Sequence, residues 1–550
     1  MAIMSVWSAQ AILLLLVPSY FIYAKWRRKT YPLPPGPKGW PIIGNALDIP
    51  LTSMGPVYAS WAKLFGEIMI LLTGDLVLTS PIGSSIISAS ALGQTIIIID
   101  SYDVAIELLE KRAAKYSSRP RAIMAGELMG WDNVFAIMPY SDRWRNHRKR
   151  LVKYFRPDAN GISVHSPRAY EFVHRLVLDI NETPNELYDL VRHTVGGLGL
   201  SLTYGLPIQR RNDPLVKFAD TIARILSDNI IPGKYLVEVL PALRYLPSWF
   251  PGAGFKRYAE SVRWMSTDFK IQPYERAVEA FETEGAQPCF VSDSLASFES
   301  REARAVIEEI QDVAATIYVA AADTTTDAIL SFIYALATHP ELRKKIQNEI
   351  DTALTDESGS LRLPTFEDQE KLPHLTASVM ESQRWAPVTP IGVPHLTTEH
   401  DVFDGYFIPK GTVIVANQWS MLNDERVYGP SPHSFNPDRF ITSDSDGPEG
   451  AVKVNPSIRH PNRIAFGFGR RVCPGSHLAQ STLWLTAACL LTLFDFEMPL
   501  SEKADYIGPD GKVDQRFDPG LLCQPRRYSR DIKVRSSKAA SLLEGLRMGM

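Results

Sequence analysis

One cysteine lies in a segment whose composition suits a metal ligand. The segment is Phe-Gly-Phe-Gly-Arg-Arg-Val-Cys-Pro-Gly, residues 466–475. Two glycines before the cysteine let the backbone turn tightly and approach a flat ligand closely. Pro474 and Gly475 lead into a strongly apolar segment that predicts a buried helix. Cys473 is therefore expected at a helix N-terminus, where free N–H groups and the helix dipole favour a thiolate. A thiolate on haem iron promotes O–O bond cleavage.

The same residue type occurs elsewhere without such a setting. We interpret the other three cysteines as buried structural thiols. The pattern of residues 466–475 disfavours this interpretation for Cys473. They are Cys289, Cys489 and Cys523. No Cys-x-x-Cys pair predicts a zinc or redox site, and four scattered cysteines do not make a disulfide framework.

An acid and an alcohol stand side by side as Asp323 and Thr324, near the middle of a segment without proline or glycine, residues 303–337. That segment predicts one helix of more than thirty residues, roughly 50 Å long. A helical threonine hydroxyl can donate to the carbonyl four residues back, here Ala320, and open the helix locally. Such an opening could host dioxygen and water beside an iron, with the acid and the alcohol supplying protons. Taken alone, Asp323 and Thr324 fit a solvated or capping role. The presence of the 466–475 segment favours their interpretation as a relay that delivers protons to oxygen.

Five residues of the 466–475 segment fill the ten-residue signature of the cytochrome P450 family, which the sequence resembles from its proline-rich segment to about residue 524. They are Phe466, Gly469, Arg471, Cys473 and Gly475. The resemblance implies a mainly α fold with small β-sheets and one large haem domain. It implies that Cys473 is the axial ligand of haem b (iron protoporphyrin IX), that Phe466 shields its sulfur, that Arg471 contacts a haem propionate and that Gly475 belongs to the cofactor site. Ala321 is a departure, since the family usually has glycine there.

Further residues gain an interpretation from the same resemblance. Trp144 and Arg148 are four apart on a predicted helix, so the indole N–H and the guanidinium point the same way and suit a propionate. Without the other motifs they would be a surface aromatic residue and a solvated arginine. His395 is expected to donate to a propionate as well, with a plain turn residue as the alternative.

A structural network is expected from Glu381 and Arg384, which are three apart on one helix face and able to pair. In the family this pair bonds to an arginine of a later loop, here Arg439. We interpret these three residues as support for the haem loop and not as catalysts. Asp438 stands where glutamate is commoner.

Other elements follow from proline and glycine. Pro340 begins a helix in its first turn, and another helix runs from near Pro373 to Trp385. Residues 402–408 and 412–416 predict two strands joined through residues 409–411. The apolar helix after Cys473 runs to about Leu493.

The first 24 residues carry no charged side chain, and the stretch from Val6 to Ala24 is just long enough to cross a bilayer. The basic residues that follow keep that flank in the cytosol: Lys25, Arg27, Arg28 and Lys29. A cleaved signal peptide is the alternative, but its basic cluster would precede the apolar stretch. With a net charge of −3, the chain has no basic excess for nucleic acid.

These observations divide the chain. We expect a transmembrane anchor at 1–24, a basic and proline-rich hinge at 25–41 that acts as a spacer, a haem domain at 42–534 and a frayed tail at 535–550. Residues 70–87 carry one charge and many β-branched residues and leucines, unlike an exposed loop. We interpret them as an addition to the fold, for example a retained intron.

The predicted function is that of a single-pass monooxygenase of the endoplasmic reticulum membrane with its catalytic domain in the cytosol. It would insert one oxygen atom of O2 into a small hydrophobic substrate, with electrons from NADPH through NADPH–cytochrome P450 reductase. The sequence looks most similar to fungal members that oxidise secondary metabolites such as terpenoids or polyketides. A basic helix near the haem, with Arg145, Arg148, Lys149, Arg150 and Lys153, could dock the reductase by charge complementarity, and a solvated helix face without a partner is the alternative. The alternatives are a haem-thiolate isomerase or dehydratase, which would need no Asp323–Thr324 relay, and a non-catalytic haem-binding protein.

Overall fold

The computed structural model describes residues 32–72, 85–157, 165–231, 233–283, 287–297, 303–445, 447, 450–499, 507–508, 511, 513–528 and 530–549. The predicted anchor and the basic half of the hinge lie outside these residues. Among the helices of the described residues, none is long and apolar enough to cross a membrane.

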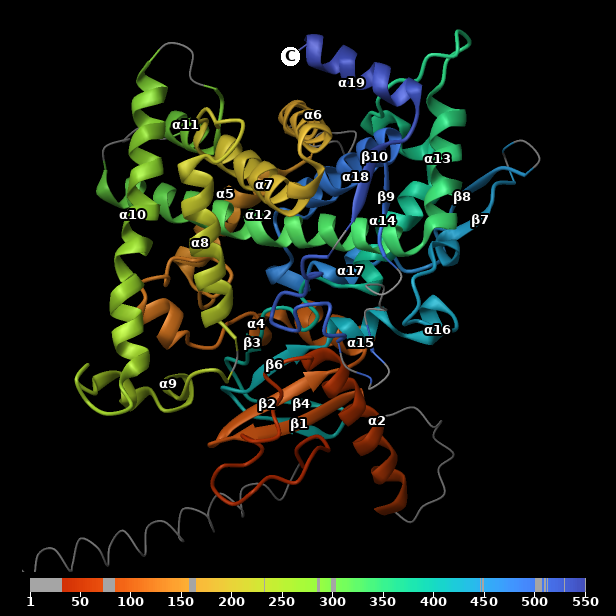
Figure 1. Ribbon diagram of the computed structural model, residues 1–550. Coiled ribbons are helices and arrows are strands. Elements are labelled where there is room, and N and C mark those ends of the chain that lie inside the picture. The colour runs from red at the N-terminus through yellow and green to blue at the C-terminus, as the bar shows by residue number, and fades with distance from the viewer. Residues whose placement is uncertain are drawn as a thin grey trace, which may run out of the picture.

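The central helix is α12, Arg304–Thr338, which runs through the middle of the molecule as predicted (Figure 1). Its two ends belong to different apolar cores. Residues 310–319 pack into one cluster and residues 329–337 into another. The stretch between them consists of alanines, threonines and aspartates, and Ala320 within it is exposed. The sequence thus leaves a small and polar section in the centre of an otherwise buried helix.

Helices surround α12 on several sides. α7, α8, α10, α14, α18 and α5 all contact it. The helices of four residues or more are α2 (Met54–Leu72), α3 (Tyr102–Ala105), η1 (Ile106–Lys111), α4 (Ala113–Tyr116), η2 (Ile123–Leu128), α5 (Asp142–Phe155), α6 (Ser166–Glu182), α7 (Leu187–Tyr204), α8 (Pro214–Asn229), α9 (Leu236–Val239), η4 (Pro241–Tyr245), α10 (Gly254–Glu282), α11 (Phe290–Ala296), α12, α13 (Pro340–Leu354), η5 (Phe366–Lys371), α14 (Pro373–Trp385), α15 (Gln418–Leu422), α16 (Glu425–Tyr428), η6 (Pro437–Phe440), α17 (Asn462–Ala465), α18 (Ser476–Leu493) and α19 (Ser537–Gly549). Two three-residue turns, η3 (Pro184–Glu186) and η7 (Gly469–Arg471), are the remaining helical elements of the described residues.

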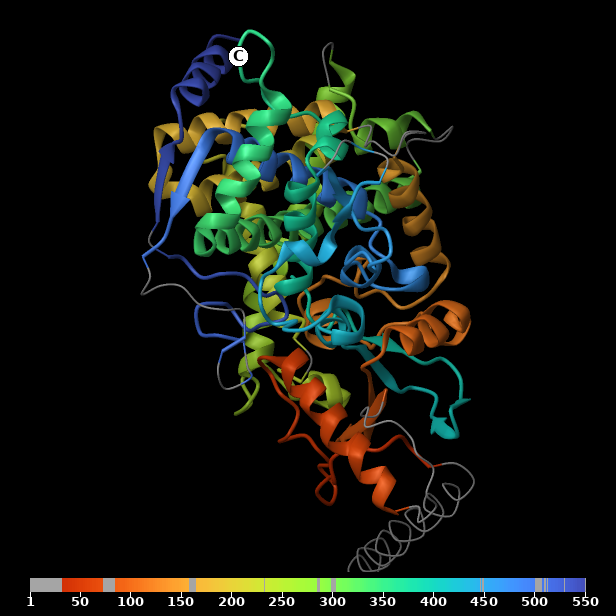
Figure 2. The same ribbon diagram turned by 90° about the vertical axis from the view of Figure 1, so that its right-hand side faces the viewer.

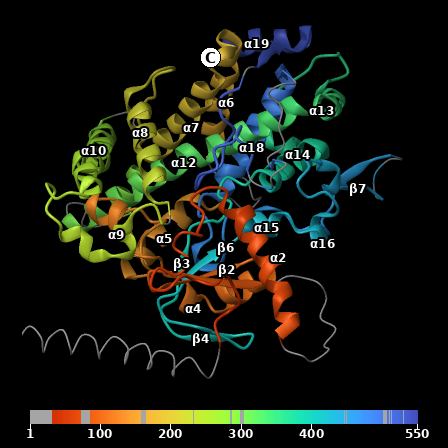
Figure 3. The same cartoon turned by 60° about the horizontal axis from the view of Figure 1, so that its bottom comes forward.

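The largest sheet has the strand order β1-β2-β6-β3 and lies apart from the helical layers, beside α2 (Figure 3). Its strands are β1 (Ile86–Ala91), β2 (Gln94–Ile99), β6 (Val413–Ala416) and β3 (His395–Leu396). β1 and β2 form an antiparallel hairpin, and β2 pairs with β6 in parallel. β3 pairs with β6 antiparallel, with His395 opposite Ile414.

The small strands differ in part from the prediction. Residues 402–408 are not one strand: β4 (Asp401–Phe403) and β5 (Tyr406–Ile408) form a hairpin. The turn between them is Asp404-Gly405, with both residues at positive φ (49° and 75°), the conformation that an Asp-Gly turn adopts readily. The other two-stranded sheets are β7 (Ile441–Ser443) with β8 (Val452–Val454), and β9 (Phe494–Glu497) with β10 (Asp531–Val534).

The described part of the hinge is not a free spacer. The carbonyls of Pro34 and Pro35 accept hydrogen bonds from the hydroxyl and the backbone N–H of Ser88, at 2.6 and 2.7 Å. Gly36 lies so close to β1 that an added Cβ would be 1.8 Å from the Ser88 carbonyl oxygen. Prolines have no N–H but keep their carbonyls, so the segment can still accept hydrogen bonds from strand β1.

The predicted insertion at 70–87 has the wrong C-terminal boundary. Ile86 and Ile87 are the first residues of β1, where they pair with Ile99 and Ile98, and both are buried. At the other end, residues 70–72 are the last residues of α2. Residues 73–84 lie outside the described part of the chain, so an addition confined to them stays a prediction.

The tail is not frayed, contrary to the prediction. Residues 537–549 form α19, which packs on α6 and α18 (Figures 1 and 2). Ala539 and Leu543 are buried, with Leu542 and Leu546 packed beside them. This i, i+3, i+4, i+7 spacing gives the helix one apolar face. Arg535, just before α19, pairs with Asp351 of α13 and so fixes the start of the helix.

Candidate functional site

The segment 466–475 is a closed loop ahead of α18. The N–H of Cys473 donates to the carbonyl of Phe466 at 2.8 Å, which brings the two ends of the loop together. Gly469 has φ of +57°, and a Cβ there would lie 2.1 Å from the carbonyl oxygen of Leu109. Only glycine fits that position without moving the neighbouring helix η1.

The Cys473 thiol lies just before α18, which begins at Ser476 with Gly475 as its N-cap. Burial raises its pKa, while a hydrogen bond from the backbone N–H of Gly475 and the positive charge of Arg148 lower it. By contrast, burial alone raises the pKa of Cys489, in the middle of α18, to about 12. Of these two thiols, only Cys473 has groups around it that stabilise a negative sulfur.

Three arginines gather beside this loop without an acid to neutralise them. Arg471 donates to the carbonyls of Ser117 and Met138 at 2.7 and 2.8 Å. Arg119 donates to the carbonyls of Ala136 and Val393. None of Arg119, Arg148 and Arg471 forms a salt bridge with a described residue.

The pKa values of two of these arginines reflect the lack of an acidic partner. Burial and the charge of Arg471 hold the pKa of Arg119 well below its usual value. Burial and the charge of Arg148 lower the pKa of Arg471 to about 9. A group of buried cations is stable only when an anion compensates it, so this cluster fits a ligand with carboxylates.

Trp144 lies against the same cluster. Its ring stacks on Phe135 with centroids 5.0 Å apart, and the Arg471 guanidinium lies 4.2 Å from its ring centroid. The indole N–H is buried and has no hydrogen-bond partner among the described residues. A buried donor of this kind costs about 1–3 kcal/mol unless an acceptor reaches it. Trp144 and Arg148 both come from α5, four residues apart as predicted.

The less buried part of α12 supplies Thr324. Its hydroxyl donates to the carbonyl of Ala320 at 2.9 Å, the bond that the sequence predicts, and α12 continues through this point without a break. Ala320 is exposed and Ala321 and Thr324 are partly so, although the residues around them are buried. This strip of α12 is therefore accessible, unlike the residues on either side of it.

The carboxylate of Asp323 lies on another side of the helix and forms no hydrogen bond with Thr324 among the described residues. Its carboxylate accepts from Arg192 of α7 at 2.6 Å and from Ser227 of α8 at 3.4 Å. It lines a cavity of about 380 Å³ together with Arg224 and Asp518. Burial raises the pKa of Asp323, and the charge of Arg192 opposes that effect.

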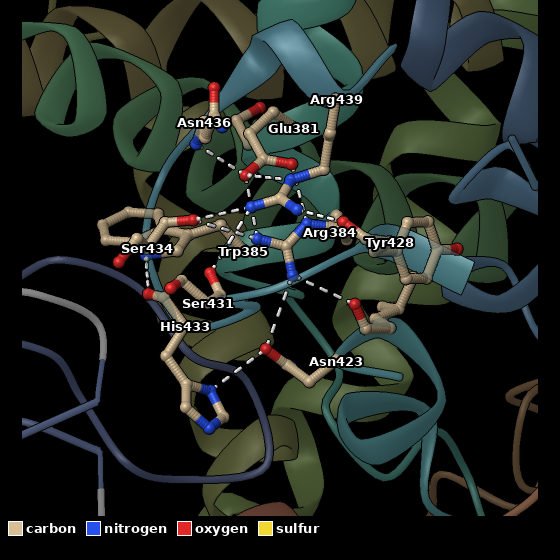
Figure 4. A network of polar contacts seen from close by, with 12 residues as sticks. Glu381, Arg384, Trp385, Asn423, Tyr428, Ser431, His433, Ser434, Asn436 and Arg439 are labelled. Carbon is tan, nitrogen blue, oxygen red and sulfur yellow. Dashed lines mark hydrogen bonds and ion pairs between the residues drawn. The ribbon is translucent and has the colours of Figure 1, made fainter. Parts of the chain in front are cut away.

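The structure brings Glu381, Arg384 and Arg439 together in one buried network (Figure 4). Arg384 donates to both carboxylate oxygens of Glu381 at 2.7 and 2.8 Å, and Arg439 donates to Glu381 Oε1 at 3.2 Å. Asn436 adds a backbone N–H at 2.8 Å, and Arg384 also reaches the carbonyl of Leu422 at 3.0 Å. The network joins α14 to the loop before η6. No hydrogen bond or ion pair joins its members to residues 466–475 in the described part of the chain, and its support of the cysteine loop stays a prediction.

Comparison with known proteins decides the family. The family model described as Cytochrome P450 matches residues 34–513. The chain belongs to the cytochrome P450 family. It is 37% identical to cytochrome P450 monooxygenase ple1 of Rhodocybe pseudopiperita, over 98% of this chain and 95% of the relative. It is 35% identical to cytochrome P450 monooxygenase 208 of Postia placenta, over 98% and 97%. Tryptamine 4-monooxygenase of Psilocybe cyanescens is 33% identical over 92% and 94%.

The P450 family implies a haem, and the residues present fit one. Cys473 offers a sulfur ligand at the end of a closed loop, on which a flat ligand can lie. Arg119, Arg148, Arg471 and the orphaned N–H of Trp144 suit two carboxylates, which haem carries as propionates. Phe466 is partly buried, and its contact with the sulfur stays a prediction.

His395 fits its predicted role less well. Its Nδ1 lies 2.8 Å from the carbonyl of Tyr116, so this nitrogen carries the proton. Nε2 can then donate to a propionate only if the ring is charged. Burial and the charge of Arg119 hold the pKa of His395 well below its usual value. Donation from His395 remains a prediction that this hydrogen bond does not favour.

Sequence reasoning missed Arg119. It lies in a loop between α4 and η2, with no helical spacing to the other basic residues. Its carbonyl partners are up to 275 residues away, so no local pattern could link it to the site.

Proposed function

We propose that this cytochrome P450 is a monooxygenase that inserts one oxygen atom of O2 into a small hydrophobic substrate. Electrons come from NADPH through NADPH–cytochrome P450 reductase. One observation carries the proposal: Thr324 is accessible in the middle of α12, while the adjacent Asp323 lines a cavity on another side of the helix. Asp323 can take up protons from that cavity, and Thr324 is its neighbour in the chain.

Haem, when bound through Cys473, supplies the binding and reductive activation of dioxygen. The residues of the chain then supply protons and exclude bulk water. Asp323 takes a proton on the side of the cavity, and rotation of its side chain away from Arg192 brings the carboxyl toward Thr324. The Thr324 hydroxyl passes a proton on to the oxygen side and is held in place by the Ala320 carbonyl. An isomerase or dehydratase would have no use for this proton path.

The test is turnover of the full-length protein with reductase, NADPH and a panel of terpenes and aromatic polyketides. We expect a product that carries one atom of ¹⁸O when the reaction runs under ¹⁸O2. Thr324→Ala should bind haem and substrate normally, but its yield of product per NADPH should fall roughly tenfold or more, because a general acid is lost. The missing electrons should appear in hydrogen peroxide.

Thr326→Ala is the matched control. Thr326 also donates to the carbonyl four residues back, at 2.7 Å, but it is fully buried and far from solvent. It should keep the product yield of the unmodified enzyme. A product whose new oxygen atom comes from water and not from O2 would contradict the proposal. Equal yields of product per NADPH in Thr324→Ala and Thr326→Ala would contradict it as well.

We infer an apolar substrate, a fungal terpenoid or polyketide, from two lines of support. The strip of α12 beside the site consists of alanine and threonine. Tryptamine, named for one relative, carries an ammonium group, and an ammonium calls for a free carboxylate. Asp323, the carboxylate next to Thr324, is already engaged with Arg192.

The reductase is proposed to dock on α5. A hollow of about 540 Å³ is lined there by Trp144, Val152 and five basic residues: Arg145, Arg148, Lys149, Lys153 and Arg156. Trp144 and Arg148 of this hollow also belong to the group of side chains beside the cysteine loop. An acidic electron donor on this face would therefore lie close to the iron. Opposite charges would speed its encounter and make it sensitive to salt.

We also propose that the chain is anchored in the endoplasmic reticulum membrane by residues 1–24. Exposed apolar side chains beside the start of the described chain support this. Trp40 and Ile42 are 63% and 86% exposed, and Trp249, after η4, is 79% exposed. The loop that carries Leu51 contacts the loop that carries Gly233, because Leu51 lies 3.5 Å from the Cβ position of Gly233. They occupy the same end of the molecule as the sheet (Figure 1). Such a patch suits a membrane surface.

Deletion of residues 1–24 should therefore weaken membrane attachment without abolishing it. The truncated protein should still sediment with lipid vesicles, and Trp249→Ser together with Ile42→Ser should release it. Thr352→Ala, an exposed change on α13, is the control. Sedimentation unchanged by the double substitution would refute the role of the patch.

A further inference from the structure

Asp327 is a buried acid one turn beyond Asp323 on α12. Its side chain is 0% exposed, and neither carboxylate oxygen has a hydrogen-bond partner among the described residues. Ser331, one turn further, has a buried hydroxyl in the same condition. Residues four apart share one helix face, with Cβ atoms about 5–6 Å apart. Asp323, Asp327 and Ser331 therefore form a polar stripe along α12.

One arginine, Arg192, pairs with two acids of this region. Arg192 of α7 donates to Asp323 at 2.6 Å and to Asp220 of α8 at 2.7 Å. Asp220 also pairs with Arg224 at 3.0 Å. Asp518 adds a further negative charge from the loop across the cavity. Arg192 is thus fully engaged, and no described cation pairs with Asp327.

Two buried carboxyls one turn apart cannot both be charged at low cost. Burial and the negative charge of Asp323 raise the pKa of Asp327 well above its ordinary value, with Arg192 and Arg224 opposing. Since Asp323 has the direct bond to Arg192, the negative charge resides there and the proton on Asp327. Two carboxyls that interact in this way titrate as a pair.

We propose that Asp327 stores a proton behind Asp323 and hands it to Asp323 for delivery toward Thr324. In this step the O–H bond of Asp327 breaks and an O–H bond forms on a carboxylate oxygen of Asp323, directly or through one water molecule. The Asp327 carboxylate then regains a proton from solvent through the cavity that Asp323 lines. No electron moves. Asp327 acts through Asp323 and does not touch the reacting atoms, and the inference rests on the proposed monooxygenase function.

The first test needs no turnover. Infrared spectroscopy distinguishes the carbonyl stretch of a protonated carboxyl from that of a carboxylate. The resting holoenzyme at neutral pH should show a protonated carboxyl that disappears in Asp327→Asn and remains in Ser331→Ala. The amide keeps the shape of the acid, so Asp327→Asn should keep its haem. If it does not fold, Asp327→Leu, which removes an unpartnered acid, is the second variant. A spectrum unaffected by loss of Asp327 overturns the proposal.

The second test is kinetic. Asp327→Asn should lower the product yield per NADPH about threefold to tenfold and increase the solvent isotope effect on turnover, because proton resupply becomes limiting. Ser331→Ala should leave both unchanged. A wild-type yield and isotope effect in Asp327→Asn would overturn the proposal. If the unmodified enzyme oxidises no substrate, the proposed function fails, whereas the infrared experiment still decides whether Asp327 holds the proton.

Discussion

Cys473→Ser is expected to abolish the strongly red-shifted Soret band of the reduced carbonyl complex. That band depends on a thiolate bound to the iron. A serine hydroxyl in the same loop is far less acidic than a thiol, even with the N–H of Gly475 and the charge of Arg148 beside it. The loss should be complete rather than graded, and product formation should cease with it. Absorbance of the purified protein after reduction and addition of carbon monoxide measures the effect.

Cys489→Ser is the matched control for this experiment. Cys489 lies in the same helix that follows the loop, is fully buried and has no neighbour that stabilises a thiolate. A serine in mid-helix can bond its hydroxyl to the carbonyl four residues back, so the change should be tolerated. Its carbonyl complex should keep the red-shifted band. A band that survives in Cys473→Ser, or one that disappears in Cys489→Ser, would show that the ligand is assigned wrongly.

The sequence could predict the long helices because proline and glycine delimit them. α12, α14 and α18 begin and end within about three residues of their predicted limits. Spacing also placed Trp144 with Arg148, and Glu381 with Arg384, on common helix faces. Local periodicity was enough for these features, since each depends on residues three or four apart.

What could not be predicted depends on contacts between distant segments. Arg192, the partner of Asp323, lies 131 residues before it in the sequence, and no pattern in α7 points to it. The orientation of Asp323 away from Thr324 follows from that ion pair. The side of α12 that carries Asp327 became interpretable only with α7 and the loop around Asp518 in place.

Three errors had local causes. The Asp404-Gly405 dipeptide is a strong hairpin signal that the strand prediction over 402–408 passed over. The apolar spacing from Ala539 to Leu546 likewise indicates an amphipathic helix. The prediction places Ile86 and Ile87 in an insertion because a run with one charge and many β-branched residues and leucines is unlike an exposed loop. It is unlike a loop because it is the start of a buried strand.

Glu381→Gln is expected to disrupt the fold around the cysteine loop. Glu381 is the acceptor for Arg384, Arg439 and the backbone of Asn436, and both Glu381 and Arg384 are fully buried. A glutamine has one acceptor oxygen and turns an N–H2 toward guanidinium donors. Two arginines then lack a counter-charge in the interior. Breaking a buried pair in this way costs about 3–5 kcal/mol. The free energy of unfolding in urea should fall by about that amount, and the purified protein should contain little haem.

Asp438→Asn makes the same chemical change one residue from Arg439. Asp438 pairs with Lys345 at 2.9 Å, but the two side chains are 61% and 46% exposed. An exposed pair contributes about 0–1 kcal/mol, so this variant should keep its stability and haem content. The comparison separates the effect of breaking the buried network from the effect of removing an exposed acid near Arg439. If Glu381→Gln retains full haem content and unfolds with the unmodified protein, then the network does not support the cysteine loop. Salt gives a further distinction, because screening should weaken the exposed Asp438–Lys345 pair and leave the buried Glu381–Arg384 pair almost unaffected.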